Sequence, residues 1–188
     1  SRYFSMQPKI SAVTAADVRY TYRAGCPIGP VSLRKLEMNF INYSGREQRG
    51  VLIVRSSKVS SVQAMFQQMF NARFRLHRMD NPNLWYGNDE EMMKADNTSA
   101  FNCRPVTGNP SKLSPHSYGT AIDINTVRNP YKAANGRWYP TNGTTWIDRS
   151  RRDAGMIFSW STPTKYVVNN GGRWGGFWYF PDYQHFEL

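Results

Sequence analysis

The strongest constraint on the fold is a stripe of apolar side chains that repeats every three or four residues across positions 58–74. Such spacing places the side chains on one face of an α-helix. The stripe consists of Val59, Val62, Phe66, Met69, Phe70 and Phe74. We therefore expect an amphipathic helix whose Met and Phe side chains pack in the core rather than around a cofactor.

Strand-like patterns occur on both sides of this helix. Residues 33–43 and 50–55 predict two strands, the second a short apolar run between a glycine and a serine pair. Residues 119–125 alternate, which puts Ile122 and Ile124 on one face and Asp123 on the other. We expect two final strands at 174–180 and 185–188.

Shorter helices are expected at 14–22, 89–96 and 149–158, and residues 97–115 have the composition of a long loop. Residues 126–148 are rich in turn-forming residues. This mixture predicts an α+β fold: a single domain with a mostly antiparallel sheet flanked by helices. We expect residues 39–188 to form the main domain and residues 1–38 an extension packed on it.

The net charge of +11 indicates an affinity for polyanions. Nucleic acid, an anionic membrane and an acidic cell wall all satisfy that condition. The basic residues are scattered, and the densest run, at 149–152, is too short for a nucleic-acid-binding arm. The sequence has no run of 18 apolar residues, so we expect no membrane span.

The two cysteines, Cys26 and Cys103, belong to no CxxC motif, which argues against a thiolate zinc site. A disulfide in an exported protein and two unpaired buried cysteines are equally compatible with the sequence. No signal peptide is visible, so an exported protein would be present here in its mature form.

Two of the three histidines lie beside carboxylates in strand-like segments. His116 precedes Asp123 by seven positions, and His185 opens the last expected strand. If the two strands are neighbours, these three side chains converge on the sheet. Two imidazoles and one carboxylate form a zinc ligand set that leaves a fourth position for water. The alternative is an ordinary set of polar pairs.

Two charged residues near these positions are candidates for chemistry. Asp182, three residues before His185, could serve as a general base, and Arg104 could stabilise negative charge. Taken alone, Asp182 fits a turn carboxylate better than a base, and Arg104 fits an ordinary surface arginine better than a catalytic one.

Residues 114–123 match the Ser-x-His-x-x-Gly-x-Ala-x-Asp signature of the VanY-type D-Ala-D-Ala carboxypeptidase family of zinc peptidases. Residues 182–187 resemble the second signature of that family, an acid shortly before a histidine. Residues 97–104 resemble the segment that carries the family arginine. The resemblance extends from about residue 39 to 188, with several separated motifs in the right order.

The resemblance implies a zinc peptidase catalytic domain at 39–188, with one Zn²⁺ per chain bound by His116, Asp123 and His185. It further implies that Asp182 is the general base and that Arg104 stabilises the substrate or the oxyanion.

Ser114, Tyr118 and Trp178 are expected to contact the substrate, with core packing as the alternative for the aromatic pair. The Asp at position 182 and the Ile-Asp-Ile-Asn-x-x-x-Asn-Pro-Tyr run resemble the L-alanyl-D-glutamate endopeptidase branch, which includes endolysins and autolysins.

These features predict a secreted or cell-wall enzyme that hydrolyses stem peptides of bacterial peptidoglycan at the L-Ala–D-Glu bond. A D-Ala–D-Ala carboxypeptidase is the first alternative, and a zinc-bearing cell-wall binding module without catalysis is the second. We expect a monomer that binds no nucleic acid.

Overall fold

The computed structural model describes residues 4–188. A four-stranded sheet consists of β1 (Lys9–Ala12), β2 (Leu33–Asn42), β3 (Glu47–Arg55) and β4 (Arg75–Leu76). The first three strands are antiparallel in the order β1-β2-β3, and β4 pairs with β2 in parallel. The strands expected at 33–43 and 50–55 are therefore confirmed.

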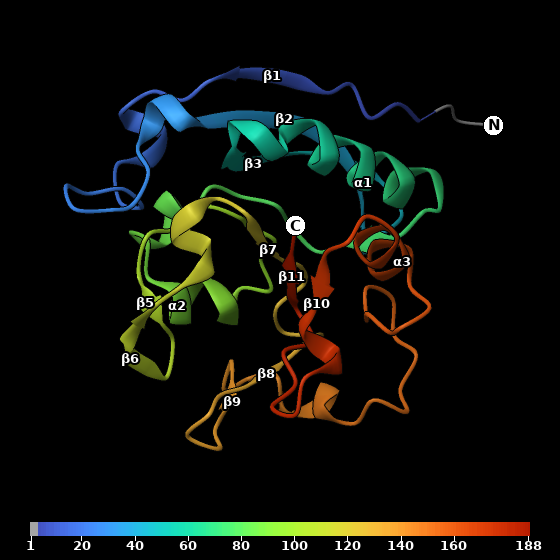
Figure 1. The fold of residues 1–188 in the computed structure, drawn as a ribbon. Helices are drawn as coiled ribbons and strands as arrows, with labels where there is room; N and C mark the ends of the chain where they lie inside the picture. Colours follow the sequence, from blue (N-terminus) through green and yellow to red (C-terminus); the bar gives the residue numbers. More distant parts are fainter. Residues whose placement is uncertain (1–3) are drawn as a thin grey trace.

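Helix α1 (Val59–Asn71) packs on this sheet, as Figure 1 shows. The stripe residues from Val59 to Phe70 are buried in the main core, together with side chains of β2 and β3. Phe74 lies beyond the end of the helix and is only partly buried against this core. The expected amphipathic helix is confirmed, and its Met and Phe side chains are core residues.

A second, three-stranded sheet lies below α1 in Figure 1 and contains β7 (Ala121–Asp123), β10 (Arg173–Trp174) and β11 (His185–Glu187). Its order is β10-β11-β7, and both pairings are antiparallel. Ile122 and Phe186 lie opposite each other in adjacent strands and are both fully buried in the core beneath α1. The opposite face of the sheet is thereby left for polar side chains.

The other elements are short. Two helices and two hairpins complete the regular structure: α2 (Asp89–Lys94), α3 (Thr162–Asn169), β5 (Pro105–Val106) with β6 (Asn109–Leu113), and β8 (Tyr131–Lys132) with β9 (Trp138–Tyr139). Single 3-10 turns occur at η1 (Ala16–Val18), η2 (Pro30–Ser32), η3 (Ser56–Lys58), η4 (Pro82–Trp85), η5 (Pro115–Tyr118), η6 (Thr144–Ile147) and η7 (Gly175–Phe177). The expected α+β fold with antiparallel sheets is confirmed, and the helix expected at 89–96 is α2.

The expected helix at 149–158 is wrong, because this segment folds back until the Ile157 carbonyl oxygen meets the side chain of Arg149. The guanidinium donates hydrogen bonds to the carbonyl oxygens of Arg128, Trp146 and Ile157, and its carbon lies 4.2 Å from the centroid of the Tyr183 ring. The helix α3 begins later, at Thr162, with a proline in its first turn.

Three further expectations differ from the structure. The strand expected at 174–180 ends at Trp174, because Gly175 lies so close to Asp182 that a Cβ there would be 2.5 Å from the Asp182 carbonyl oxygen. The helix expected at 14–22 is only the turn η1, although Thr14 and Asp17 do exchange hydrogen bonds at its start. The expected loop at 97–115 contains the β5–β6 hairpin.

The N-terminal segment is joined to the rest of the molecule in two ways. Strand β1 pairs with β2, and a disulfide links Cys26 to Cys103. The expected division between residues 38 and 39 falls within β2 and stays a prediction. None of the helices in residues 4–188 has the length and apolar composition that crossing a membrane requires.

Candidate metal centre

His116 is positioned by a capped turn just before β7. The Ser114 side chain accepts a hydrogen bond from the His116 backbone N–H, which fixes the start of η5. Gly119 ends this turn with φ of +69°, and a Cβ there would lie 2.8 Å from the Arg55 nitrogen. The glycine therefore allows the turn to pack directly against β3.

Asp123 and His185 are positioned by the pairing of β7 with β11. They lie directly opposite each other in the antiparallel register, so their side chains project from the same face of the sheet. The convergence expected from the sequence is confirmed: one ligand atom from each of His116, Asp123 and His185 lies within 4.8 Å of the others.

The carboxylate of Asp123 lies between the two imidazole rings. Its Oδ2 is 2.9 Å from His116 Nε2, and its Oδ1 is 3.1 Å from His185 Nδ1. All three residues are buried, with exposed fractions of 3%, 6% and 5% for His116, Asp123 and His185. The two rings meet edge to face, with their centroids 5.2 Å apart.

The hydrogen bonding of His116 shows that this cluster fits a cation. Nδ1 lies 2.6 Å from the Ala100 carbonyl oxygen and donates to it, which leaves a lone pair on Nε2. That buried Nε2 has no hydrogen-bond partner among residues 4–188, although a carboxylate oxygen of Asp123 is near it. Two electron-rich atoms facing each other in a buried site require a positive charge between them. Two imidazoles and one carboxylate are a donor set that suits Zn²⁺.

The electrostatics of the three side chains agree with this interpretation. Burial by itself raises the pKa of Asp123, but the two histidines outweigh it and lower the pKa well below its ordinary value. Burial by itself lowers the pKa of His185, but hydrogen bonds with Asp123 and Glu187 raise it to about 10. The acidic groups thus create a field that holds a positive charge, whether a proton or a metal ion.

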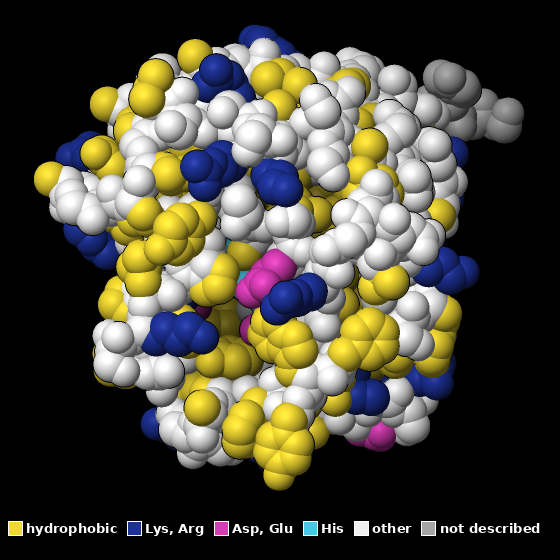
Figure 2. All heavy atoms as spheres, viewed as in Figure 1, with side chains coloured by type: hydrophobic (Ala, Val, Ile, Leu, Met, Phe, Trp, Pro, Cys, Tyr) yellow, Lys and Arg dark blue, Asp and Glu magenta, His cyan; other side chains and the backbone are white. Residues whose placement is uncertain are grey.

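A cleft of about 300 Å³ opens over the cluster. Its lining includes His116, Asp123 and His185, together with Arg104 and Asp182. Figure 2 shows a hollow on this face in which acidic and histidine side chains are visible, surrounded by hydrophobic and basic ones. The structure therefore brings the expected ligands, base and cation to one cavity.

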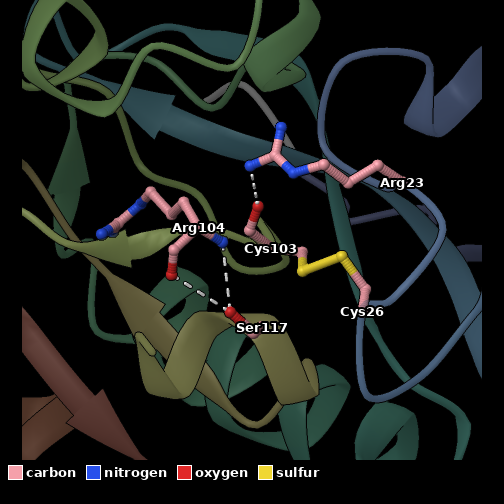
Figure 3. Close-up of a disulfide and its surroundings, with 5 residues drawn as sticks. All are labelled: Arg23, Cys26, Cys103, Arg104 and Ser117. Atoms are coloured by element: carbon pink, nitrogen blue, oxygen red, sulfur yellow. Dashed lines mark hydrogen bonds between the residues drawn. A yellow bond between two sulfur atoms is a disulfide. The ribbon is translucent and has the colours of Figure 1, made fainter. Parts of the chain in front are cut away.

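The backbone of Arg104 is fixed from several directions. The neighbouring Cys103 is bonded to Cys26, and the Ser117 hydroxyl bonds both the backbone nitrogen and the carbonyl oxygen of Arg104 (Figure 3). Arg23 donates to the Cys103 carbonyl oxygen at 2.9 Å. The Arg104 side chain extends away from the disulfide (Figure 3).

The guanidinium of Arg104 is only partly satisfied. One terminal nitrogen lies 3.1 Å from Asp89 Oδ1, and the Thr107 hydroxyl donates to the other oxygen of that carboxylate at 2.6 Å. The buried Nε has no hydrogen-bond partner among the described residues. Arg104 therefore has one orienting ion pair with Asp89, a hydrogen bond from its other terminal nitrogen to the Pro105 carbonyl oxygen at 3.1 Å, and an Nε–H that no described residue accepts.

Asp182 lies in the cleft wall, where its backbone N–H donates to the Gly175 carbonyl oxygen at 2.9 Å. Its Oδ1 is buried and has no hydrogen-bond partner within residues 4–188. Burial raises the pKa of this carboxyl to about 8, with Asp123 and Asp89 adding to the rise. Asp182 therefore has a carboxyl oxygen in the cleft wall that no described residue engages.

Of the three residues expected to contact the substrate, two line the cleft and one does not. Ser114 and Trp178 line the cleft, and the Trp178 ring centroid is 5.5 Å from that of His185. Tyr118 is 41% exposed and lies outside the lining.

Sequence reasoning did not single out Asp89, which pairs with Arg104, or Glu187, which contacts His185. For Glu187 a signal existed: residues 185 and 187 of a strand share one face.

Comparisons with known proteins agree with this geometry. A family model described as D-alanyl-D-alanine carboxypeptidase matches residues 107–188, a segment that contains all three expected ligands and Asp182. The resemblance inferred from the motifs is confirmed over residues 107–188, as is the class of zinc metallopeptidase, whereas the match does not reach the expected residues 39–106. No curated protein and no solved structure matches the chain.

Proposed function

We propose that this protein hydrolyses the L-Ala–D-Glu bond in peptidoglycan stem peptides, starting from the match of residues 107–188 to the D-alanyl-D-alanine carboxypeptidase family model. One observation carries the enzymatic part of this proposal. A buried two-histidine, one-carboxylate cluster shares a cleft with an unengaged carboxylate oxygen of Asp182 and an unengaged N–H of Arg104.

His116, Asp123 and His185 would hold the zinc ion. When bound, zinc supplies a Lewis acid that polarises a peptide carbonyl and acidifies water. The Ala100 carbonyl oxygen, which accepts a hydrogen bond from His116 Nδ1, orients that imidazole ring so that Nε2 faces the cluster.

Asp182 is the residue we assign to proton transfer. Its Oδ1 accepts a proton from the attacking water and then returns it to the departing amine. Arg104 is held by Asp89 so that its free Nε–H can donate to the carbonyl oxygen as negative charge develops there. Loss of a single donor of this kind costs about 10²–10³-fold in turnover.

The choice of bond rests on the sequence. An aspartate at the position of the base and the run that begins at Ile122 resemble the endopeptidase branch. The description of the matching family favours the D-Ala–D-Ala carboxypeptidase as the second candidate. The cationic surface suits either substrate, because bacterial walls are rich in carboxylates and phosphates.

The decisive experiment is digestion of purified peptidoglycan and synthetic stem peptides, with mass spectrometry of the fragments. The proposal predicts release at the L-Ala–D-Glu bond, inhibition by a chelator and recovery with zinc. Loss of a terminal D-Ala instead would establish the carboxypeptidase, and no cleavage of any stem peptide would refute the enzyme.

Two variants test the assigned roles. Asp182→Asn and Arg104→Ala should bind zinc normally but lose at least 100-fold in turnover. Asp148→Asn, which alters a fully exposed carboxylate, serves as the control. Full activity in either test variant would show that its assigned role is wrong.

A further inference from the structure

Glu187 lies on the same face of β11 as His185, two positions further along the strand. The residue between them, Phe186, is fully buried on the core side. The backbone of Glu187 is fixed on both sides, since it pairs with Ala121 of β7 and with Arg173 of β10. The Glu187 side chain is half-buried and lines the cleft.

The Glu187 carboxylate contacts the ring nitrogen of His185 that does not face Asp123. Oε1 lies 3.1 Å from His185 Nε2, and the other ring nitrogen, Nδ1, lies 3.1 Å from Asp123 Oδ1. An ionised carboxylate only accepts hydrogen bonds, so Nε2 must carry the hydrogen in this contact. In a neutral imidazole the lone pair is then on Nδ1, directed into the three-residue cluster.

The two histidines of the cluster are thus oriented by different acceptors. His116 donates from Nδ1 to a backbone carbonyl, which is neutral, whereas His185 donates from Nε2 to a carboxylate. A carboxylate partner makes the opposite nitrogen of the ring more electron-rich than a carbonyl does. The Trp178 ring, packed 5.5 Å from His185, limits the ring's freedom to turn away.

We propose that Glu187 is a positioning residue that fixes the tautomer and orientation of His185 and thereby strengthens divalent-metal binding by His116, Asp123 and His185. This inference rests on the proposed metal site but does not depend on which bond the protein cleaves. Glu187 acts through His185 and touches no reacting atom.

The test compares zinc affinity in the full-length wild type and in the variants Glu187→Ala and Glu187→Gln, measured by competition with a chromogenic chelator. Alanine removes the acceptor and should weaken zinc binding about 10–100-fold. Glutamine keeps an acceptor oxygen and should recover most of that loss. Glu91→Ala removes an exposed helical carboxylate and is the matched control, expected to bind like the wild type.

A second readout separates positioning from general damage to the fold. The visible absorption spectrum of the Co²⁺-loaded protein reports the ligand geometry and should change in Glu187→Ala but not in Glu91→Ala. Thermal unfolding of the metal-free variants shows whether the fold is intact. If Glu187→Ala binds zinc within twofold of the wild type and keeps its cobalt spectrum, Glu187 has no positioning role. If the wild type itself binds no zinc, the proposed function fails instead.

Discussion

The disulfide between Cys26 and Cys103 should contribute strongly to stability but little to turnover. It closes a loop with a sequence separation of 77, for which chain entropy gives about 4.5 kcal/mol at room temperature. For a chain of this size that corresponds to about 9–18 °C in Tm. Turnover should survive below the unfolding transition, because Ser114 and Ser117 still hold the backbone of Arg104.

The assay is urea unfolding of the wild type, the reduced wild type and the double variant Cys26→Ala/Cys103→Ala. Reduced wild type and double variant should lose similar free energies of unfolding, and a reductant should leave the double variant unchanged. A loss below about 1 kcal/mol would refute the entropic reasoning. Normal stability combined with lost turnover would show that the disulfide itself positions Arg104.

Three further outcomes are expected. Arg149→Met should lower the free energy of unfolding by about 2–4 kcal/mol in urea titrations, because carbonyl oxygens around a partly buried guanidinium lose their donors. An unchanged midpoint would contradict the role of Arg149 in the 149–158 segment. Gly119→Ala should cost about 1–3 kcal/mol by the same assay, since φ is +69° and the added Cβ meets the backbone of Arg55; a stability equal to wild type would exclude that strain. The rate of hydrolysis of whole cell walls, measured as the loss of turbidity, should fall as salt shortens the Debye length to about 8 Å and below. The rate of hydrolysis of a small peptide should not fall. Equal salt dependence of the two rates would contradict the role assigned to surface charge.

The elements predicted correctly are those marked by a regular spacing of apolar residues within one short segment. The stripe from Val59 to Phe70 repeats with the helical period, and α1 follows it. Ile122 and Asp123 alternate with the strand period, and the structure buries the first and turns the second toward the cluster. Periodicity by itself did not establish that β7 and β11 are neighbours, but the family resemblance implied a shared ligand set.

The elements predicted wrongly depend on contacts that no regular spacing in the sequence marks. The segment after Arg149 folds back so that the Ile157 carbonyl oxygen meets a guanidinium that also bonds the carbonyl oxygens of Arg128 and Trp146. The strand after Trp174 is interrupted because Gly175 must approach the backbone of Asp182 closely. Neither contact has a sequence spacing that would reveal it.

The candidate site was predictable in its ligands but not in its supporting residues. The histidines and Asp123 belong to recognisable motifs, whereas Asp89 reaches Arg104 only through the packing of α2 against the β5–β6 hairpin region. Such orienting residues act through tertiary geometry. Asp89 and Glu187 can be assigned as orienting residues only from the three-dimensional positions of Arg104 and His185.

The most direct test of the metal site is the metal content of the purified protein, measured by inductively coupled plasma mass spectrometry. The wild type should contain one zinc ion per chain, and the variants His116→Ala, Asp123→Ala and His185→Ala should each lose it while remaining folded. Zinc that stays bound in all three folded variants would contradict the assignment of these side chains as the metal ligands.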